Sequence, residues 1–204
     1  MFQKIIILLL IVTFSFSDDL KKEKNNNQSK TLTNIYTFLN NKPSRIEKRV
    51  EQLEKLETRL KNKKLTDFQK ISLINNYYNK FKYISDKKLW NKRDYWVSPS
   101  EFNIIRYGDC DDFALAKYYM LKKMDIGVTQ DIYYVYTKKK QAHAITLVKL
   151  NNGITYVLDN LRGKIKPLSE TYYRKKLIFS YNQNKFFGRY LKNLTKFEQA
   201  IVLN

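Results

Sequence analysis

The sequence predicts one α+β domain in which helices come first and antiparallel strands follow. Between residues 43 and 124, apolar residues recur at spacings of three and four, which is typical of amphipathic helices. After residue 132, stretches rich in Tyr and Val are separated by turn residues, which is typical of strands. The chain has 204 residues, 43% of them hydrophobic, with no internal repeat and no linker rich in Pro or Gly. This length and composition predict a single packed domain.

The N-terminus has the pattern of a secretory signal peptide. Lys4 gives a positive start, residues 5–14 are almost entirely apolar, and small serines follow. An uncleaved membrane anchor is the alternative, although the apolar run is short for a membrane span. We therefore expect residues 1–17 to be a cleaved signal peptide, residues 18–42 a polar lead-in, and residues 43–204 the domain. This predicts a soluble protein in the periplasm.

Two helices are predicted at the start of the domain. The first covers residues 43–63 and carries a stripe of Ile, Val and Leu. The second begins at a capping box formed by Thr66 and Gln69 and extends to about Tyr83. Residues 85–96 form a loop that contains both tryptophans.

Two shorter helices follow this loop. Ser98 and Glu101 form a second capping box, which begins a helix that ends near Arg106. After a turn at residues 107–109, another helix is predicted over residues 110–124. Three aspartates cluster at its start, where the helix dipole stabilises negative charge.

The strands come next, at residues 132–137, 142–150 and 154–159. An Asn-Asn-Gly turn between the last two predicts a hairpin. Beyond residue 167 the pattern indicates only aromatic-rich stretches and a terminal helix near Thr195.

Charge and composition limit the possible partners. The chain has 39 Lys and Arg against 19 Asp and Glu, a net charge of +20. A basic surface attracts anionic lipid headgroups, acidic polymers or acidic proteins, but Lys is spread along the whole chain, as expected of a merely solvated surface. Nucleic acid is not expected as the partner of an exported chain. One Cys excludes an internal disulfide framework, and one His excludes a multi-His metal site.

The only Cys and the only His are candidates for a nucleophile and its base. Cys110 begins a predicted helix, where unpaired N–H groups and the dipole lower a thiol pKa. The neighbouring aspartates oppose this unless a cation or an imidazolium offsets them. His143 lies on a predicted strand, and Asp159 ends the next one and can orient the imidazole. Each residue alone also fits a structural role: a small core Cys, a hydrogen-bonded His and a turn Asp.

The hairpin turn decides whether His143 and Asp159 share a face of the sheet. A two-residue turn pairs Asn151 with Ile154 and puts the two side chains on opposite faces. A three-residue turn pairs Leu150 with Ile154 and makes His143 and Asp159 diagonal neighbours, about 7–8 Å apart. Gly in the left-handed conformation favours the three-residue turn. The predicted triad requires this turn or a bulge.

These residues together resemble a known family. The runs Gly-Asp-Cys-Asp-Asp-Phe-Ala at 108–114, His-Ala at 143–144 and Val-Leu-Asp-Asn at 157–160 are similar to motifs of the bacterial transglutaminase-like cysteine proteinases. The best-known members are the LapG-type periplasmic proteases. The similarity extends over about residues 75–161, and Asp111 stands where these proteins usually carry Glu.

The resemblance implies a papain-like, transglutaminase-like fold, with the Cys at a helix start packed on an antiparallel sheet. It implies a periplasmic, calcium-dependent cysteine endopeptidase. Cys110 would be the nucleophile, His143 the general base and then acid, and Asp159 the group that orients the imidazole.

The resemblance also implies Ca²⁺ as a cofactor. Asp109 and Asp111 occupy the positions of the family's calcium ligands, with Asp112 as a further candidate. Three acids within four residues suit a cation that prefers several oxygen ligands. The implied substrate is the N-terminal region of a large outer-membrane-associated adhesin, whose cleavage controls biofilm attachment. An inner-membrane cyclic di-GMP receptor that sequesters the protease is the implied regulator.

Three other functions are open to the same sequence. The triad would also serve an acyl transferase of the transglutaminase type. The chain would otherwise be a non-catalytic exported binding module, with Cys110 and His143 buried apart, or a basic protein that coats anionic envelope polymers. The sequence does not predict an oligomeric state.

Overall fold

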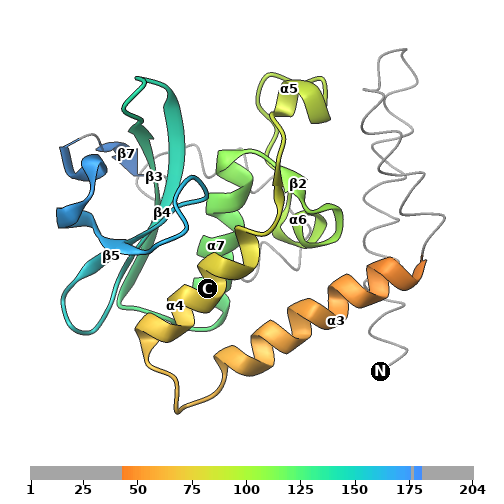
Figure 1. Cartoon of the computed structure of the whole chain (residues 1–204), viewed down its shortest axis with the longest axis horizontal. Helices are drawn as coiled ribbons and strands as arrows, with labels where there is room; N and C mark the ends of the chain where they lie inside the picture. Colours follow the sequence, from red (N-terminus) through yellow and green to blue (C-terminus); the bar gives the residue numbers. More distant parts are fainter. Residues whose placement is uncertain (1–42, 176, 181–204) are drawn as a thin grey trace.

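The computed structural model describes residues 43–175 and 177–180 (Figure 1). The predicted signal peptide at residues 1–17, the lead-in at residues 18–42 and the helix predicted near Thr195 lie outside these ranges. In the described ranges, no helix is both long and apolar enough to cross a membrane.

The helical part comes first, as the sequence predicts. Two capping boxes are confirmed: the Thr66 side chain accepts from the N–H of Gln69, and the Ser98 side chain accepts from the N–H of Glu101. Each cap satisfies backbone groups that a helix start leaves unpaired. The helices are α3 (Pro43–Leu60), α4 (Asp67–Tyr78), α5 (Asp86–Leu89), α6 (Pro99–Ile105) and α7 (Cys110–Lys123).

The second helix is shorter than predicted. It ends at Tyr78, and the residues expected to complete it form strand β1 (Lys82–Tyr83). Strand β1 pairs in parallel with β2 (Tyr107–Gly108), which the sequence predicts as a turn. The aromatic periodicity continues past Tyr78, but a non-local pairing decides the backbone there: the N–H of Ile84 donates to the carbonyl of Gly108 at 2.9 Å. This pairing brings the residues after β1 beside the start of α7.

The strands form one antiparallel sheet in the order β6-β5-β4-β3-β7. Two 3₁₀ turns, η1 (Leu168–Glu170) and η2 (Tyr172–Lys175), connect β6 to β7. The strands are β3 (Thr129–Tyr136), β4 (Ala142–Lys149), β5 (Thr155–Leu158), β6 (Lys166–Pro167) and β7 (Leu177–Ser180).

The three-residue hairpin turn between β4 and β5 is confirmed. The N–H of Leu150 donates to the carbonyl of Ile154 at 3.0 Å, so these two residues face each other. Gly153 has a φ of 78°, a left-handed conformation that is unfavourable for other residues. The register that follows, with Thr146 opposite Leu158, places His143 and Asp159 on the same face of the sheet.

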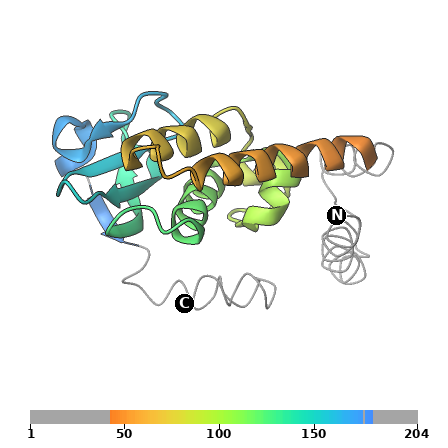
Figure 2. The ribbon, with the colours of Figure 1, turned by 90° about the horizontal axis from the view of Figure 1, so that it is seen from below.

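Helix α7 lies between the sheet and the other helices, as Figures 1 and 2 show. On the face of β4 toward α7, the Thr146 hydroxyl donates to the Ala114 carbonyl at 2.7 Å. On the other face, Ile145 packs in a buried cluster with Val157 and Tyr173. The helices and the sheet thus form one α+β architecture, as the sequence predicts. This packing positions Cys110, at the start of α7, and His143, on β4.

Candidate active site

His143 and Asp159 form a buried hydrogen-bonded pair. Nε2 of His143 lies 2.8 Å from Oδ1 of Asp159, and the two side chains are only 4% and 3% exposed. Oδ1 also accepts the N–H of Leu161 at 2.9 Å, and Oδ2 accepts the hydroxyl of Tyr173 at 2.9 Å. Burial raises the pKa of Asp159, but the hydrogen bond and charge of His143, with the other donors, lower it below its ordinary value. The carboxylate is therefore stable as an anion.

Cys110 lies at the first residue of α7, as the sequence predicts, and is half-buried. The backbone N–H of Ala144, the residue after His143, donates to its sulfur, so α7 and β4 meet at the nucleophile. Burial raises the pKa of the thiol to about 12, and the nearby Asp109 carboxylate adds to this effect. The expectation that neighbouring aspartates oppose ionisation is confirmed, but the lowered thiol pKa expected at the helix start is wrong, because burial is the larger effect.

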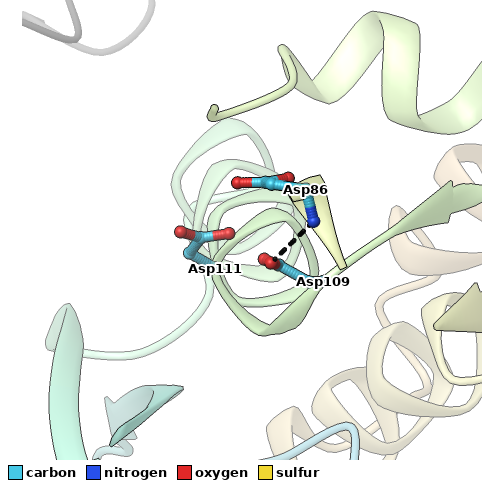
Figure 3. A group of neighbouring side chains, drawn as sticks. All are labelled: Asp86, Asp109 and Asp111. Carbon is cyan, nitrogen blue, oxygen red and sulfur yellow. Dashed lines mark hydrogen bonds between the residues drawn. The ribbon is translucent and has the colours of Figure 1, made fainter. Parts of the chain in front are cut away.

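A cluster of three carboxylates lies at the start of α7 (Figure 3). One ligand atom from each of Asp86, Asp109 and Asp111 can be chosen so that all lie within 4.8 Å of one another. Asp86 comes from the first residue of α5, while Asp109 caps α7 and Asp111 lies in its first turn. The N–H of Asp86 donates to Oδ2 of Asp109 at 3.4 Å, which ties the two segments together.

Surrounding groups compensate the charges of this cluster only in part: the N–H of Tyr95 donates to Oδ2 of Asp86, and the N–H of Asp112 donates to Oδ1 of Asp111 at 2.9 Å. Burial raises the pKa of Asp86 to about 7, with Asp109 adding to the effect, and it raises the pKa of Asp111 well above its ordinary value. Oδ1 of Asp86 and Oδ1 of Asp109 are buried, and neither has a hydrogen-bond donor in the part of the chain described. A set of oxygen ligands with unfilled acceptors fits a hard dication such as Ca²⁺.

Asp112 lies beside this cluster but has a different role. Its Oδ1 accepts the N–H of Val97 at 2.8 Å, and its Oδ2 accepts the N–H of Asp109 at 3.0 Å. A Cβ at Gly108 would collide with this carboxylate, so glycine is required for the close approach. The structure thus brings together Asp109 and Asp111 of the predicted metal set, uses Asp112 to hold two backbone segments, and adds Asp86.

Sequence reasoning missed Asp86 because nothing in the local pattern connects it to residues 109–111. The sequence predicts a loop over residues 85–96, which is wrong for Asp86–Leu89 because these residues form helix α5. A loop gave no reason to select one of its acids. Only the parallel pairing of β1 and β2 brings it to the start of α7.

A second residue missed from the sequence is Lys117, which is fully buried on α7. Its Nζ donates to Oδ1 of Asn79 at 2.7 Å, and Nδ2 of Asn79 donates to the carbonyl of Asp159 at 2.8 Å. Burial lowers the pKa of Lys117 to about 7, and the negative charge of Asp159 acts in the opposite direction. The signal available in the sequence was a single lysine among the apolar residues of the predicted helix at residues 110–124.

The chain matches the model of a known family. The family model of the bacterial transglutaminase-like cysteine proteinases matches residues 26–188, most of the chain. Among curated proteins, no sequence matches the chain.

Solved structures of Legionella pneumophila LapG are similar to the protein. One is 26% identical with a TM-score of 0.57, and covers 78% of this chain and 87% of that one. A calcium-bound form is 26% identical with a TM-score of 0.57, covering 74% and 84%. An EGTA-treated form is 27% identical with a TM-score of 0.58, covering 76% and 84%. The chain has the transglutaminase-like α+β fold and belongs to the bacterial transglutaminase-like cysteine proteinases, as a cysteine peptidase of the LapG type.

Proposed function

We propose that the protein is a periplasmic, calcium-dependent cysteine endopeptidase in which Cys110, His143 and Asp159 form the catalytic triad. The observation that carries the proposal is the buried hydrogen bond between His143 and Asp159. The next residue after His143 is Ala144, whose backbone N–H donates to the Cys110 sulfur. General-base activation requires a carboxylate that fixes the imidazole, as Asp159 fixes His143, and an imidazole that can reach the thiol. The contact of the Ala144 N–H with Cys110 supports the second requirement, because Ala144 directly follows His143.

The proposed mechanism follows from which imidazole nitrogen is already engaged. Nε2 of His143 is held by Asp159, so Nδ1 removes the proton from the Cys110 thiol. The sulfur attacks the peptide carbonyl carbon, and the N–H of Cys110 at the helix start stabilises the oxyanion. The protonated Nδ1 then gives its proton to the leaving amine. Nδ1 next deprotonates a water molecule, which hydrolyses the thioester and frees the sulfur.

Calcium would be held by Asp86, Asp109 and Asp111, supported by their unfilled oxygens and raised pKa values. When bound, it supplies the positive charge that offsets the carboxylates opposing the Cys110 thiolate. Calcium in one form of the similar Legionella protein supports the same choice of cation. Asp111 is one methylene shorter than the Glu usual at this position, so we expect weaker affinity than a Glu would give.

Location and substrate extend the proposal beyond the site. The N-terminal pattern of residues 1–17 supports export to the periplasm. Similarity to LapG supports the N-terminal region of a large outer-membrane-associated adhesin as substrate, with a role in biofilm attachment, and an inner-membrane cyclic di-GMP receptor as regulator. Family membership favours this activity over the binding-module and polymer-coating hypotheses.

The test uses the outer-membrane fraction of the source organism as substrate. It is incubated with the wild-type protein or with Cys110→Ala, with calcium or with EGTA, and new protein N-termini are identified by mass spectrometry. We expect new N-termini in a large surface protein only with wild type and calcium. Isopeptide crosslinks in place of new N-termini would instead indicate the transferase. Undiminished cleavage by a folded Cys110→Ala variant contradicts the proposal. Cell fractionation checks the location, with a mature N-terminus expected at Asp18.

A further inference from the structure

The triad carboxylate is bound on its second oxygen by a tyrosine. The hydroxyl of Tyr173 donates to Oδ2 of Asp159 at 2.9 Å, and the tyrosine is only 2% exposed. We propose that Tyr173 is a positioning residue of the active site, which fixes the plane of the Asp159 carboxylate so that Oδ1 stays on Nε2 of His143. This inference rests on the proposed function of the His143–Asp159 pair.

The two carboxylate oxygens have separate partners. Oδ1 accepts Nε2 of His143 and the N–H of Leu161, and Oδ2 accepts the hydroxyl of Tyr173. The terminal torsion of Asp is broad, so contacts to one oxygen alone define the carboxylate plane poorly. A donor on the other oxygen restricts that rotation. It also satisfies an acceptor whose burial without a partner would be costly.

The tyrosine is itself held in place. Its ring packs in the buried cluster with Ile145 and Val157, and the guanidinium of Arg162 lies 5.5 Å from its centroid. Burial raises the pKa of Tyr173, and the negative charge of Asp159 raises it further, so the phenol stays protonated and remains a donor. The ring centroid is 6.3 Å from that of His143, so one side chain contacts both members of the pair.

A small cavity of about 90 Å³ adjoins this hydrogen bond. A water molecule could enter it and partly replace a missing hydroxyl, because polar groups line the space. This moderates the effect expected from loss of the hydroxyl alone. The cavity is lined by Val157, Asp159, Arg162, Lys164, Lys166, Thr171 and Tyr173.

The experiment removes the donor and keeps the ring, by Tyr173→Phe in the full chain with calcium. The single His and the single Cys make two readouts unambiguous. The first is the Nε2 proton of His143 in long-range ¹H–¹⁵N spectra. The second is the rate at which iodoacetamide alkylates Cys110. We expect faster exchange or broadening of the Nε2 proton and an alkylation rate about tenfold lower, because a small misplacement of a catalytic group is costly.

Three further variants separate the possible outcomes. Tyr136→Phe, on an exposed tyrosine of β3, should match wild type in both readouts. Tyr173→p-aminophenylalanine restores a donor at the same place and should recover most of the lost rate, which a purely structural role of the ring would not explain. His143→Ala should slow alkylation strongly, because the thiol then loses its proposed general base.

Wild-type spectra and rates in a folded Tyr173→Phe variant would overturn the role of Tyr173. If Tyr173→Phe does not fold, the p-aminophenylalanine variant decides: wild-type readouts support the role, and a rate as low as that of His143→Ala contradicts it. If His143→Ala alkylates as fast as wild type, the proposed triad itself fails, whatever Tyr173 does.

Discussion

Two groups of buried carboxylates at this site differ in how their charge is compensated. Asp159 receives donors on both oxygens and is close to His143 and Lys117, and its pKa lies below the ordinary value. Asp86 and Asp111 each have a pKa raised by burial and further by Asp109, and with Asp109 they form a cluster with unfilled oxygens. Protein groups alone compensate the charge of Asp159, whereas the cluster of Asp86, Asp109 and Asp111 is suited to bind a cation.

Replacing Asp159, the carboxylate whose charge is compensated, should have the largest effect. Asp159→Ala leaves Nε2 of His143 and the hydroxyl of Tyr173 buried without their acceptor. We expect cleavage to fall by about 10³-fold or more, because the imidazole loses its orienting group, and the free energy of unfolding to fall by about 1–3 kcal/mol. The cleavage rate is measured on the surface protein that the outer-membrane test identifies, and a urea melt measures the free energy of unfolding.

Asp159→Asn sharpens the same test. Its amide oxygen can still accept from Nε2, so we expect an intermediate rate. A rate for Asp159→Ala within twofold of wild type, in a folded protein, contradicts the role of Asp159.

Removing a charge from the acid cluster should raise the stability of the calcium-free protein, whereas removing the charge of Asp159 lowers stability. In the calcium-free protein, Asp86 has a pKa of about 7, above its ordinary value. Between about pH 4 and pH 7, the folded chain keeps a proton that the unfolded chain releases, so the free energy of unfolding falls as pH rises. Asp86→Asn removes the part of this slope that Asp86 causes, and the variant should be more stable than wild type at pH 7.5 without calcium.

Added calcium should reverse the order of these two proteins. It raises the melting temperature of wild type by binding the folded state, and should have at least tenfold lower affinity for Asp86→Asn. The control is Asp125→Asn, an equal charge change at an exposed site, which should keep the response of wild type. Equal calcium affinity of all three proteins, by calorimetry, would exclude Asp86 as a ligand.

A smaller effect is expected at Lys117, the buried cation near Asp159. Its pKa is lowered to about 7, so between pH 7 and about pH 10 the unfolded chain binds a proton that the folded chain does not. The free energy of unfolding of wild type should therefore rise with pH in this range. Lys117→Met removes this rise and should stabilise the protein by about 1 kcal/mol at pH 7.

Lys122→Met, on an exposed lysine of the same helix, is the control and should keep the slope of wild type. Melts at several pH values compare the three proteins. A Lys117→Met variant that is less stable than wild type at pH 7 would mean that the hydrogen bond to Asn79 outweighs the cost of burying the amine.

The sequence by itself determined the starts of several helices and one essential strand register. Capping boxes at Thr66 and Ser98 specify helix starts because they satisfy backbone donors locally. The Asn-Asn-Gly turn specifies a three-residue hairpin, and the period of two along each strand then puts His143 and Asp159 on one face. Family motifs identified the nucleophile, and the helix start at Cys110 agrees with them.

The tertiary structure alone decided the partners that come from distant segments. Asp86 joins the acid cluster through the β1–β2 pairing, Lys117 reaches Asp159 through Asn79, and Tyr173 reaches Oδ2 from the 3₁₀ turn after β6. No local pattern encodes these contacts, because they depend on how the elements pack and not on spacing along the chain. Propensity and periodicity specify where an element begins and which face it buries. The partners of polar groups at the ends of elements come from segments that only the packed fold places beside them.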